Sequence, residues 1–95
     1  MTATSPRYLA DPADALISRD LDGITALYHR PSGQTHLLVE PAPLLLSLLA
    51  NGGMTLAKLT AALRVHLNIP ENDDISAVVA ERLAELERSG LVWRA

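Results

Sequence analysis

The sequence predicts an α+β domain, in which a three-stranded N-terminal antiparallel β-sheet is followed by three helices whose packing as a winged helix stays open. The spacing of apolar residues changes after Glu40 from a period of two to a period of about 3.6. Turn signals divide the first part into short strands, and glycines end the helices of the second part. With 95 residues the chain can bury one hydrophobic core. We expect a flexible N-terminal arm over residues 1–14 and a single domain over residues 15–95.

Three strands are expected at roughly 15–20, 24–30 and 34–39, because turn signals at residues 20–23 and 31–34 separate them. A two-residue loop at Ser32-Gly33 would pair Tyr28 with Leu37 and His29 with His36. One face of this sheet gathers more apolar side chains than the other, so we expect it to lie on the helices. Its members are Ile24, Ala26, Tyr28, Leu37 and Val39.

Residues that favour the start or the end of a helix indicate where the three helices lie. Proline at 41 and 43 permits a start to a first, all-round apolar helix that Asn51-Gly52-Gly53 ends. Thr55 is the expected N-cap of a second helix over Leu56–Leu67, and Asp73 or Asp74 caps a third over Ile75–Ser89, with Gly90 after its end. Leu91-Val92-Trp93 then forms a short closing strand or docked tail, in which Trp93 is available to fill a gap.

Composition excludes several classes of protein. The 48% of hydrophobic residues, 18 of them leucines, must form an aliphatic core, and the ordinary charged fraction of 20% excludes a disordered chain. The absence of cysteine excludes disulfides, thiol catalysis and the common zinc modules. No apolar run is long enough for a membrane span and residues 1–10 do not resemble a secretory signal, so we expect a cytoplasmic protein without a membrane partner. The net charge of −3 argues against a nucleic-acid partner.

Few residues suggest chemistry. His29 and His36 provide two imidazoles, too few for a zinc site, and His36 lies in a strand rather than at the helix N-terminus that a phosphoacceptor histidine needs. Asn72-Asp73-Asp74 suits helix capping better than a calcium loop, and Gly52-Gly53 lacks the lysine of a phosphate loop. We therefore expect no catalytic residues, no metal and no cofactor, that is, no enzyme.

Four segments together resemble a known family. They are Ser32-Gly33-Gln34-Thr35-His36-Leu37-Leu38, the helix end Ala50-Asn51-Gly52-Gly53, residues 54–59 and residues 83–92. The chain is similar over about residues 15–93 to the PqqD family of small peptide chaperones, in particular to the branch that accompanies proteins related to HPr kinase, where Ser-Gly-x-Thr-His-x-Leu is characteristic. It departs from PqqD proper in lacking an aromatic-rich N-terminal segment.

The resemblance implies a three-stranded N-terminal antiparallel β-sheet followed by a three-helix winged-helix-like bundle. It also implies that this module binds a precursor peptide as an extra strand beside the third strand, against the third helix, and presents it to a modifying enzyme. Arg82 would be placed to hold an acidic residue of the ligand. A homodimer stays open, because a peptide, a partner, the arm or a second copy should cover the free strand edge. A winged-helix DNA-binding or transcription-associated domain is the alternative, although residues 41–95 carry five basic and six acidic side chains. The expected peptide-binding residues are Gln34, Thr35, His36, Leu37, Leu38, Val39, Val78, Arg82, Leu83, Glu85 and Leu86.

Overall fold

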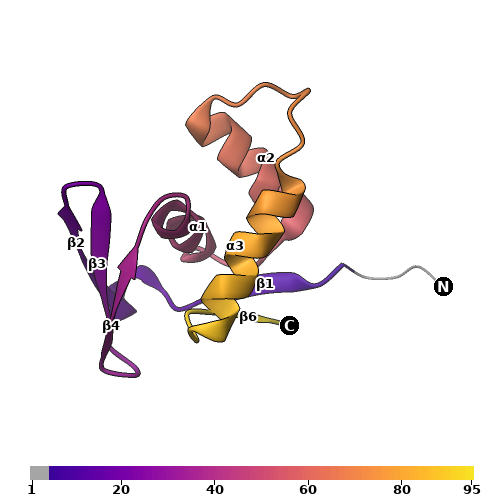
Figure 1. Cartoon of the computed structure of the whole chain (residues 1–95). Coiled ribbons are helices and arrows are strands. Elements are labelled where there is room, and N and C mark those ends of the chain that lie inside the picture. The colour runs from indigo at the N-terminus through magenta and orange to yellow at the C-terminus, as the bar shows by residue number, and fades with distance from the viewer. Residues whose placement is uncertain (1–4) are drawn as a thin grey trace.

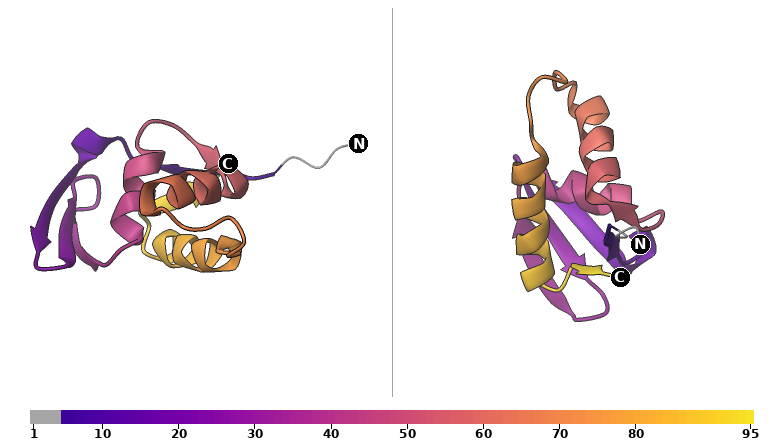
Figure 2. Two further views of the ribbon diagram at one scale, coloured as in Figure 1. Left: turned by 90° about the horizontal axis from the view of Figure 1, so that it is seen from above. Right: turned by 90° about the vertical axis from the view of Figure 1, so that its right-hand side faces the viewer.

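The computed structural model describes residues 5–95 and shows an α+β fold with two three-stranded antiparallel sheets and three helices (Figure 1). The first sheet has the strand order β2-β3-β4 and lies at one end of the molecule. The second sheet, of order β5-β1-β6, lies with the helices at the other end (Figure 2). Residues 1–4 of the expected arm lie outside the described residues. No helix in the described part of the chain combines the length and the apolar character that crossing a membrane requires.

The first sheet contains the three expected strands, β2 (Leu16–Leu21), β3 (Ile24–His29) and β4 (Gln34–Leu38). Asp22 and Gly23 connect β2 to β3 with φ values of 59° and 92°. Two successive left-handed residues are what a tight hairpin turn of matching twist requires, and Asp-Gly supplies them at low cost.

The loop between β3 and β4 has four residues, 30–33, instead of the expected two. Gly33 N donates to His29 O at 2.8 Å, and the register pairs Tyr28 with Thr35 and Leu27 with His36. The predicted pairing of Tyr28 with Leu37 was therefore wrong, since the longer loop shifts β4 by two positions. The predicted pairing of His29 with His36 was wrong for the same reason.

The face of this sheet that packs on the helices is the opposite of the predicted one. Leu27 and His29 are buried, and Leu16 and Leu38 pack against the core. Burial of His29 is tolerated because both of its ring nitrogens have hydrogen-bond partners. The side chains predicted to face the helices point to solvent instead or are half-buried: Ile24, Ala26, Tyr28, Leu37 and Val39.

The three expected helices are present as α1 (Ala42–Leu49), α2 (Leu56–Leu67) and α3 (Ser76–Arg88). Thr55 accepts a hydrogen bond from Lys58 N at 3.3 Å, which confirms the predicted N-cap of α2. Before α3, Asp74 Oδ1 accepts from Ser76 N at 3.0 Å. The helices α2 and α3 lie side by side (Figure 2). The core between the helices and the sheets is aliphatic apart from one tyrosine: Tyr8, Leu27, Leu45, Leu46, Leu49, Leu59, Leu63, Val79, Leu83, Leu86, Leu91 and Val92.

The second sheet joins both ends of the described chain. Strand β1 (Arg7–Ala10) lies between β5 (Met54–Thr55) and β6 (Val92–Arg94), and a 3-10 turn η1 (Ala13–Ala15) leads from β1 to β2. Residues 7–10 thus belong to a sheet, which differs from the arm expected before residue 15. The pairing on both edges and the burial of Tyr8 explain the difference.

The closing segment is also a strand, but its aromatic residue does not fill a gap. Gly90, at φ 84°, ends α3, and Leu91 N donates to Leu86 O at 3.0 Å. Leu91 and Val92 are then buried, whereas Trp93 remains 45% exposed. The core therefore closes without the indole of Trp93.

Candidate functional site

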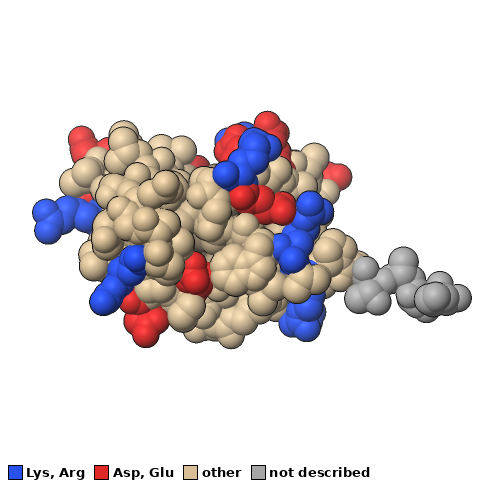
Figure 3. Space-filling view, turned by 90° about the horizontal axis from the view of Figure 1, so that it is seen from below, with Lys and Arg blue, Asp and Glu red and all other residues tan. Residues whose placement is uncertain are grey.

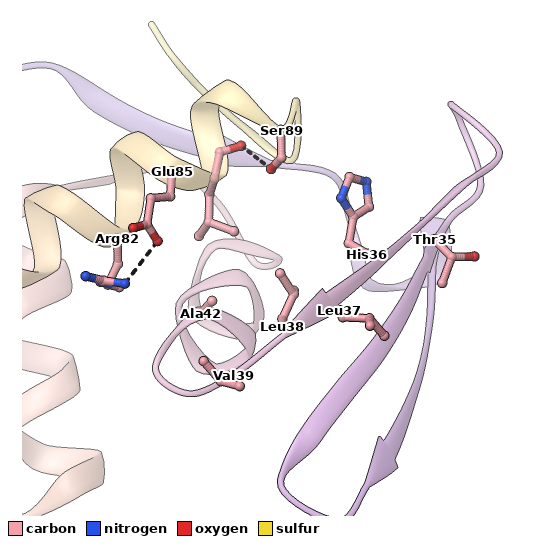
Figure 4. A pocket seen from close by; sticks show the side chains of 10 residues that line it. Thr35, His36, Leu37, Leu38, Val39, Ala42, Arg82, Glu85 and Ser89 are labelled. Atoms are coloured by element: carbon pink, nitrogen blue, oxygen red, sulfur yellow. Dashed lines mark hydrogen bonds and ion pairs between the residues drawn. The ribbon is translucent and has the colours of Figure 1, made fainter.

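A groove of about 430 Å³ lies between strand β4 and helix α3, with the start of α1 at its floor (Figure 4). We call it the β4–α3 groove. Within residues 5–95, β4 pairs with β3 only, so it is one of the two edge strands of its sheet. The residues that line the groove are Thr35, His36, Leu37, Leu38, Val39, Ala42, Arg82, Glu85, Leu86 and Ser89.

The strand side of the groove combines side chains with an open main-chain edge. His36 points toward α3 and Leu38 toward α1, whereas the side chains of Thr35 and Leu37 point away to the other face of the sheet (Figure 4). Thr35 and Leu37 therefore present chiefly main chain to the groove. An extended segment could pair with this edge and lay alternate side chains against α3.

The helix side of the groove carries an ion pair. Arg82 donates to Glu85 at 3.1 Å and also lies 3.5 Å from a carboxylate oxygen of Glu81. Ser89, the C-cap residue of α3 and four residues after Glu85, donates to Leu86 O at 2.9 Å. The Arg82 side chain is about one-third exposed, so its guanidinium is held by the helix but stays accessible to a ligand.

His36 is the unusual polar group of the groove. Its Nε2 atom is buried and has no hydrogen-bond partner among the described residues. Its ring meets the ring of His29 edge-on, with the centroids 6.5 Å apart. A buried nitrogen without a partner reduces stability, so this rare arrangement needs an explanation, and a role in the groove is one.

The structure brings most of the expected binding residues together, but not all. Gln34 lies exposed at the start of β4, and Leu83 is completely buried in the core. Val78 lines a separate pocket of about 240 Å³, formed with Pro41, Leu63, Leu67, Ile69 and Ile75. None of these three expected residues contributes to the β4–α3 groove.

Sequence reasoning missed two residues of the groove, Ala42 and Ser89. Ser89 lies on the same face of α3 as Arg82 and Glu85, seven and four residues later, so helical periodicity was a usable signal. Ala42 is placed by the sharp change of direction after β4, where its N–H donates to Val39 O at 3.0 Å. That contact has no signature in the residue pattern.

A second polar cluster was also missed. His29 Nδ1 lies 2.7 Å from Ser32 Oγ, and His29 Nε2 lies 2.7 Å from Asp11 Oδ2. These are the residue types of a serine hydrolase triad. However, the Ser32 hydroxyl is also engaged within the hairpin loop, where it accepts from Gln34 N at 3.3 Å, and none of the three residues lines the groove. We interpret the cluster as a clip between the β3–β4 hairpin and the segment before β2.

An alternative site would be a metal-binding cluster, or a basic patch that could bind anions, elsewhere in the described part of the chain. Within residues 5–95, no three histidine, aspartate or glutamate side chains come together as metal ligands. On the face shown in Figure 3, basic side chains lie among acidic ones rather than in a single patch. The β4–α3 groove therefore remains the best-developed candidate site.

No protein-family model, curated protein or solved structure matches this chain. The resemblance to PqqD therefore rests on the sequence motifs alone, and the candidate site rests on its own geometry.

Proposed function

We propose that this chain is a non-catalytic, cytoplasmic peptide-binding module with a PqqD-like, winged-helix-like arrangement. It binds a precursor peptide as an added strand on β4, in the β4–α3 groove, and presents it to a modifying enzyme. The observation that carries this proposal is the combination, in one groove, of an unpaired strand edge and a helix wall. The edge would provide main-chain hydrogen bonds, and the wall would select side chains.

The two edges of the sheet differ in a way that supports the choice of β4. Strand β2 carries Arg19 and Asp20, and charged side chains on an edge strand discourage pairing with another chain. Residues 34–39 of β4 and its continuation carry no Asp, Glu, Lys or Arg. The β4 edge thus lacks the charged side chains that discourage strand pairing, so an added strand can pair with it.

The wall of the groove suggests the kind of peptide that fits. Ala42 and Leu86 provide an apolar surface, and Arg82 with Glu85 provides one cation and one anion. Main-chain pairing is indifferent to sequence, so selectivity would come from an apolar residue on this surface and a carboxylate near Arg82.

The DNA-binding alternative is less well supported by the charges of α3. This helix carries three glutamates and two arginines, and Arg82 is already paired with Glu81 and Glu85. Phosphates approaching α3 would meet carboxylates, which opposes the electrostatic attraction on which DNA affinity depends.

The test uses synthetic peptides that correspond to short reading frames encoded beside the gene, titrated into the ¹⁵N-labelled full chain. We expect amide shifts concentrated in residues 34–39 and 82–89. Shifts spread evenly over the domain, or no shifts with any of these peptides, would contradict the proposal.

A main-chain control separates strand addition from simple side-chain docking. In an added strand, only every second amide of the peptide pairs with β4. Peptides N-methylated on alternate residues, in the two possible parities, should therefore differ in affinity by about tenfold or more. Equal affinities would show that the peptide does not bind as a strand.

A further inference from the structure

The outward face of the first sheet is strongly apolar. We call it the outer sheet face: it consists of the outward side chains of β2, β3 and β4 together with Val39. Among the described residues, ten large hydrophobic side chains are exposed, and six of them lie on this face. They are 40% to 70% exposed: Ile17, Leu21, Ile24, Tyr28, Leu37 and Val39.

The register places these side chains side by side. Ile17 pairs with Tyr28 and Leu21 with Ile24, while Ala26 lies between Arg19 and Leu37. The patch therefore extends across all three strands, and Arg19 is the one charged residue of the three strands on this face. Clustering of this kind, unlike scattered exposed leucines, marks an interaction surface.

The area of the patch indicates what kind of contact it could form. Taking about 200 Å² for a fully exposed large side chain, the exposed fractions amount to roughly 600 Å² of accessible surface per copy. This is at the upper end of the largest patch on a typical monomer, about 300–600 Å². Two such faces in contact would bury about 1,200 Å², which is the size of a weak dimer interface.

The shape of the outer sheet face, with a protruding side chain beside a small one, is complementary to a second copy of the same face. Leu37 is its most exposed member, at 70%, and its cross-strand neighbour is Ala26, the smallest side chain in the middle of the patch. A two-fold arrangement can place Leu37 of each copy over Ala26 of the other, since each contact in such an interface occurs twice. Arg19 can lay its aliphatic part on the patch with its guanidinium at the rim.

We propose that the occupant of the outer sheet face is a second copy of this chain, packed sheet on sheet. The dimer would cover the side chains of Leu37 and Val39, which also line the β4–α3 groove, but it leaves uncovered the opposite side of β4, where His36 and Leu38 face α3 and α1 (Figure 4). This inference stands independently of what the groove binds. The alternative self-association, pairing of two β4 edges, would instead occupy the groove.

The test is sedimentation velocity of the full chain over roughly 10 µM to 1 mM. We expect a reversible dimer with a Kd on the order of 0.1 mM, as befits an interface of this size. Ile17→Glu and Leu37→Glu should each weaken it at least about tenfold, since each places a carboxylate in the patch. The matched control is Val65→Glu on α2, where the side chain is 81% exposed and outside the patch, so dimerisation should not change.

Circular dichroism verifies that each variant remains folded, and Tyr28→Ser is the substitute where a glutamate variant does not fold. A chain that stays monomeric throughout would overturn the proposal and leave the face to a different protein. So would an equal effect of Val65→Glu. A dimer that is sensitive to Leu37→Glu but not to Ile17→Glu would overturn it in favour of pairing between β4 edges, because β2 lies at the opposite side of the sheet.

Discussion

The Nε2 atom of His29 lies 2.7 Å from Asp11 Oδ2, and this contact fastens the segment before β2 to the end of β3. Replacing Asp11 with alanine leaves a buried ring nitrogen without a partner. We expect Asp11→Ala to lower the free energy of unfolding by about 1–3 kcal/mol in urea denaturation. Asp14→Ala, an exposed aspartate in the neighbouring turn η1, is the control and should have little effect. Equal losses in the two variants would show that the clip contributes nothing.

The same cluster allows a test for hydrolase chemistry. If Ser32, His29 and Asp11 only clip the hairpin, a fluorophosphonate probe will not label the native chain. Labelling that disappears in Ser32→Ala would contradict the non-catalytic proposal, because it would identify an activated serine.

The imidazole of His36 should reduce the stability of the folded chain. Since its Nε2 atom is buried without a partner among the described residues, His36→Leu should raise the free energy of unfolding by about 1 kcal/mol. His66→Leu, at an exposed position of α2, is the matched control and should give no comparable gain. A loss of stability in His36→Leu would indicate that the imidazole makes a favourable contact in the folded chain.

Substitutions of Arg82 and Glu85 should change the affinity for an acidic peptide in opposite directions. Glu85→Gln frees Arg82 from its nearest partner, so a groove-binding peptide with an acidic residue should bind about tenfold more tightly. Arg82→Gln should weaken the same peptide by a similar factor. Isothermal titration calorimetry measures both, with Arg88→Gln on α3 outside the groove lining as the control. Because the ion pair is partly exposed, neither variant should change stability by more than about 0.5 kcal/mol. Equal affinity of the wild type and both variants would exclude Arg82 as the carboxylate-binding residue.

Asp74 gives the start of α3 a dependence on pH. Hydrogen bonds from the Ser76 hydroxyl and then from the Ser76 main-chain N–H lower the pKa of Asp74 below its ordinary value of 3.8. The stabilisation is therefore fully present above that ordinary pKa and is lost as the pH falls through the lowered value.

Ser76→Ala removes the larger of these two causes, so the pKa of Asp74 should rise toward 3.8 in a carboxyl-detected NMR titration. Ser89→Ala, at the other end of α3, should leave this pKa unchanged. An unchanged pKa in Ser76→Ala would mean that the hydroxyl does not hold the carboxylate in solution.

The helices could be predicted from the sequence because their signals are local. Thr55 caps α2 from a position adjacent to its first residue, and Gly90 ends α3 with a left-handed φ that glycine adopts freely. The hairpin register could not be predicted in this way. It depends on how many residues the loop takes, and Ser32-Gly33 suited both a two-residue and a four-residue loop.

The inner face of the first sheet was mispredicted because the more apolar set of side chains was expected to face the helices. Leu27 and Leu38 lie on the other set with His29, whose burial depends on a contact with Asp11, 18 residues away. Long-range partners of this kind cannot be identified from periodicity. The same applies to the candidate site, where the resemblance indicated β4 and α3 but could not place Ala42.

Strand β1 holds residue 7 next to residue 95, at the other end of the described chain. Ala95 N donates to Arg7 O at 2.9 Å, and Arg7 N donates to Ala95 O at 3.4 Å, so the described chain forms an almost complete ring. A short linker between these two residues would permit circular permutation, with new termini at the exposed Asp22-Gly23 turn at the opposite end of the molecule (Figure 1). The permuted chain would begin with β3 and end with β2, and none of the helices or strands would be interrupted by the cut.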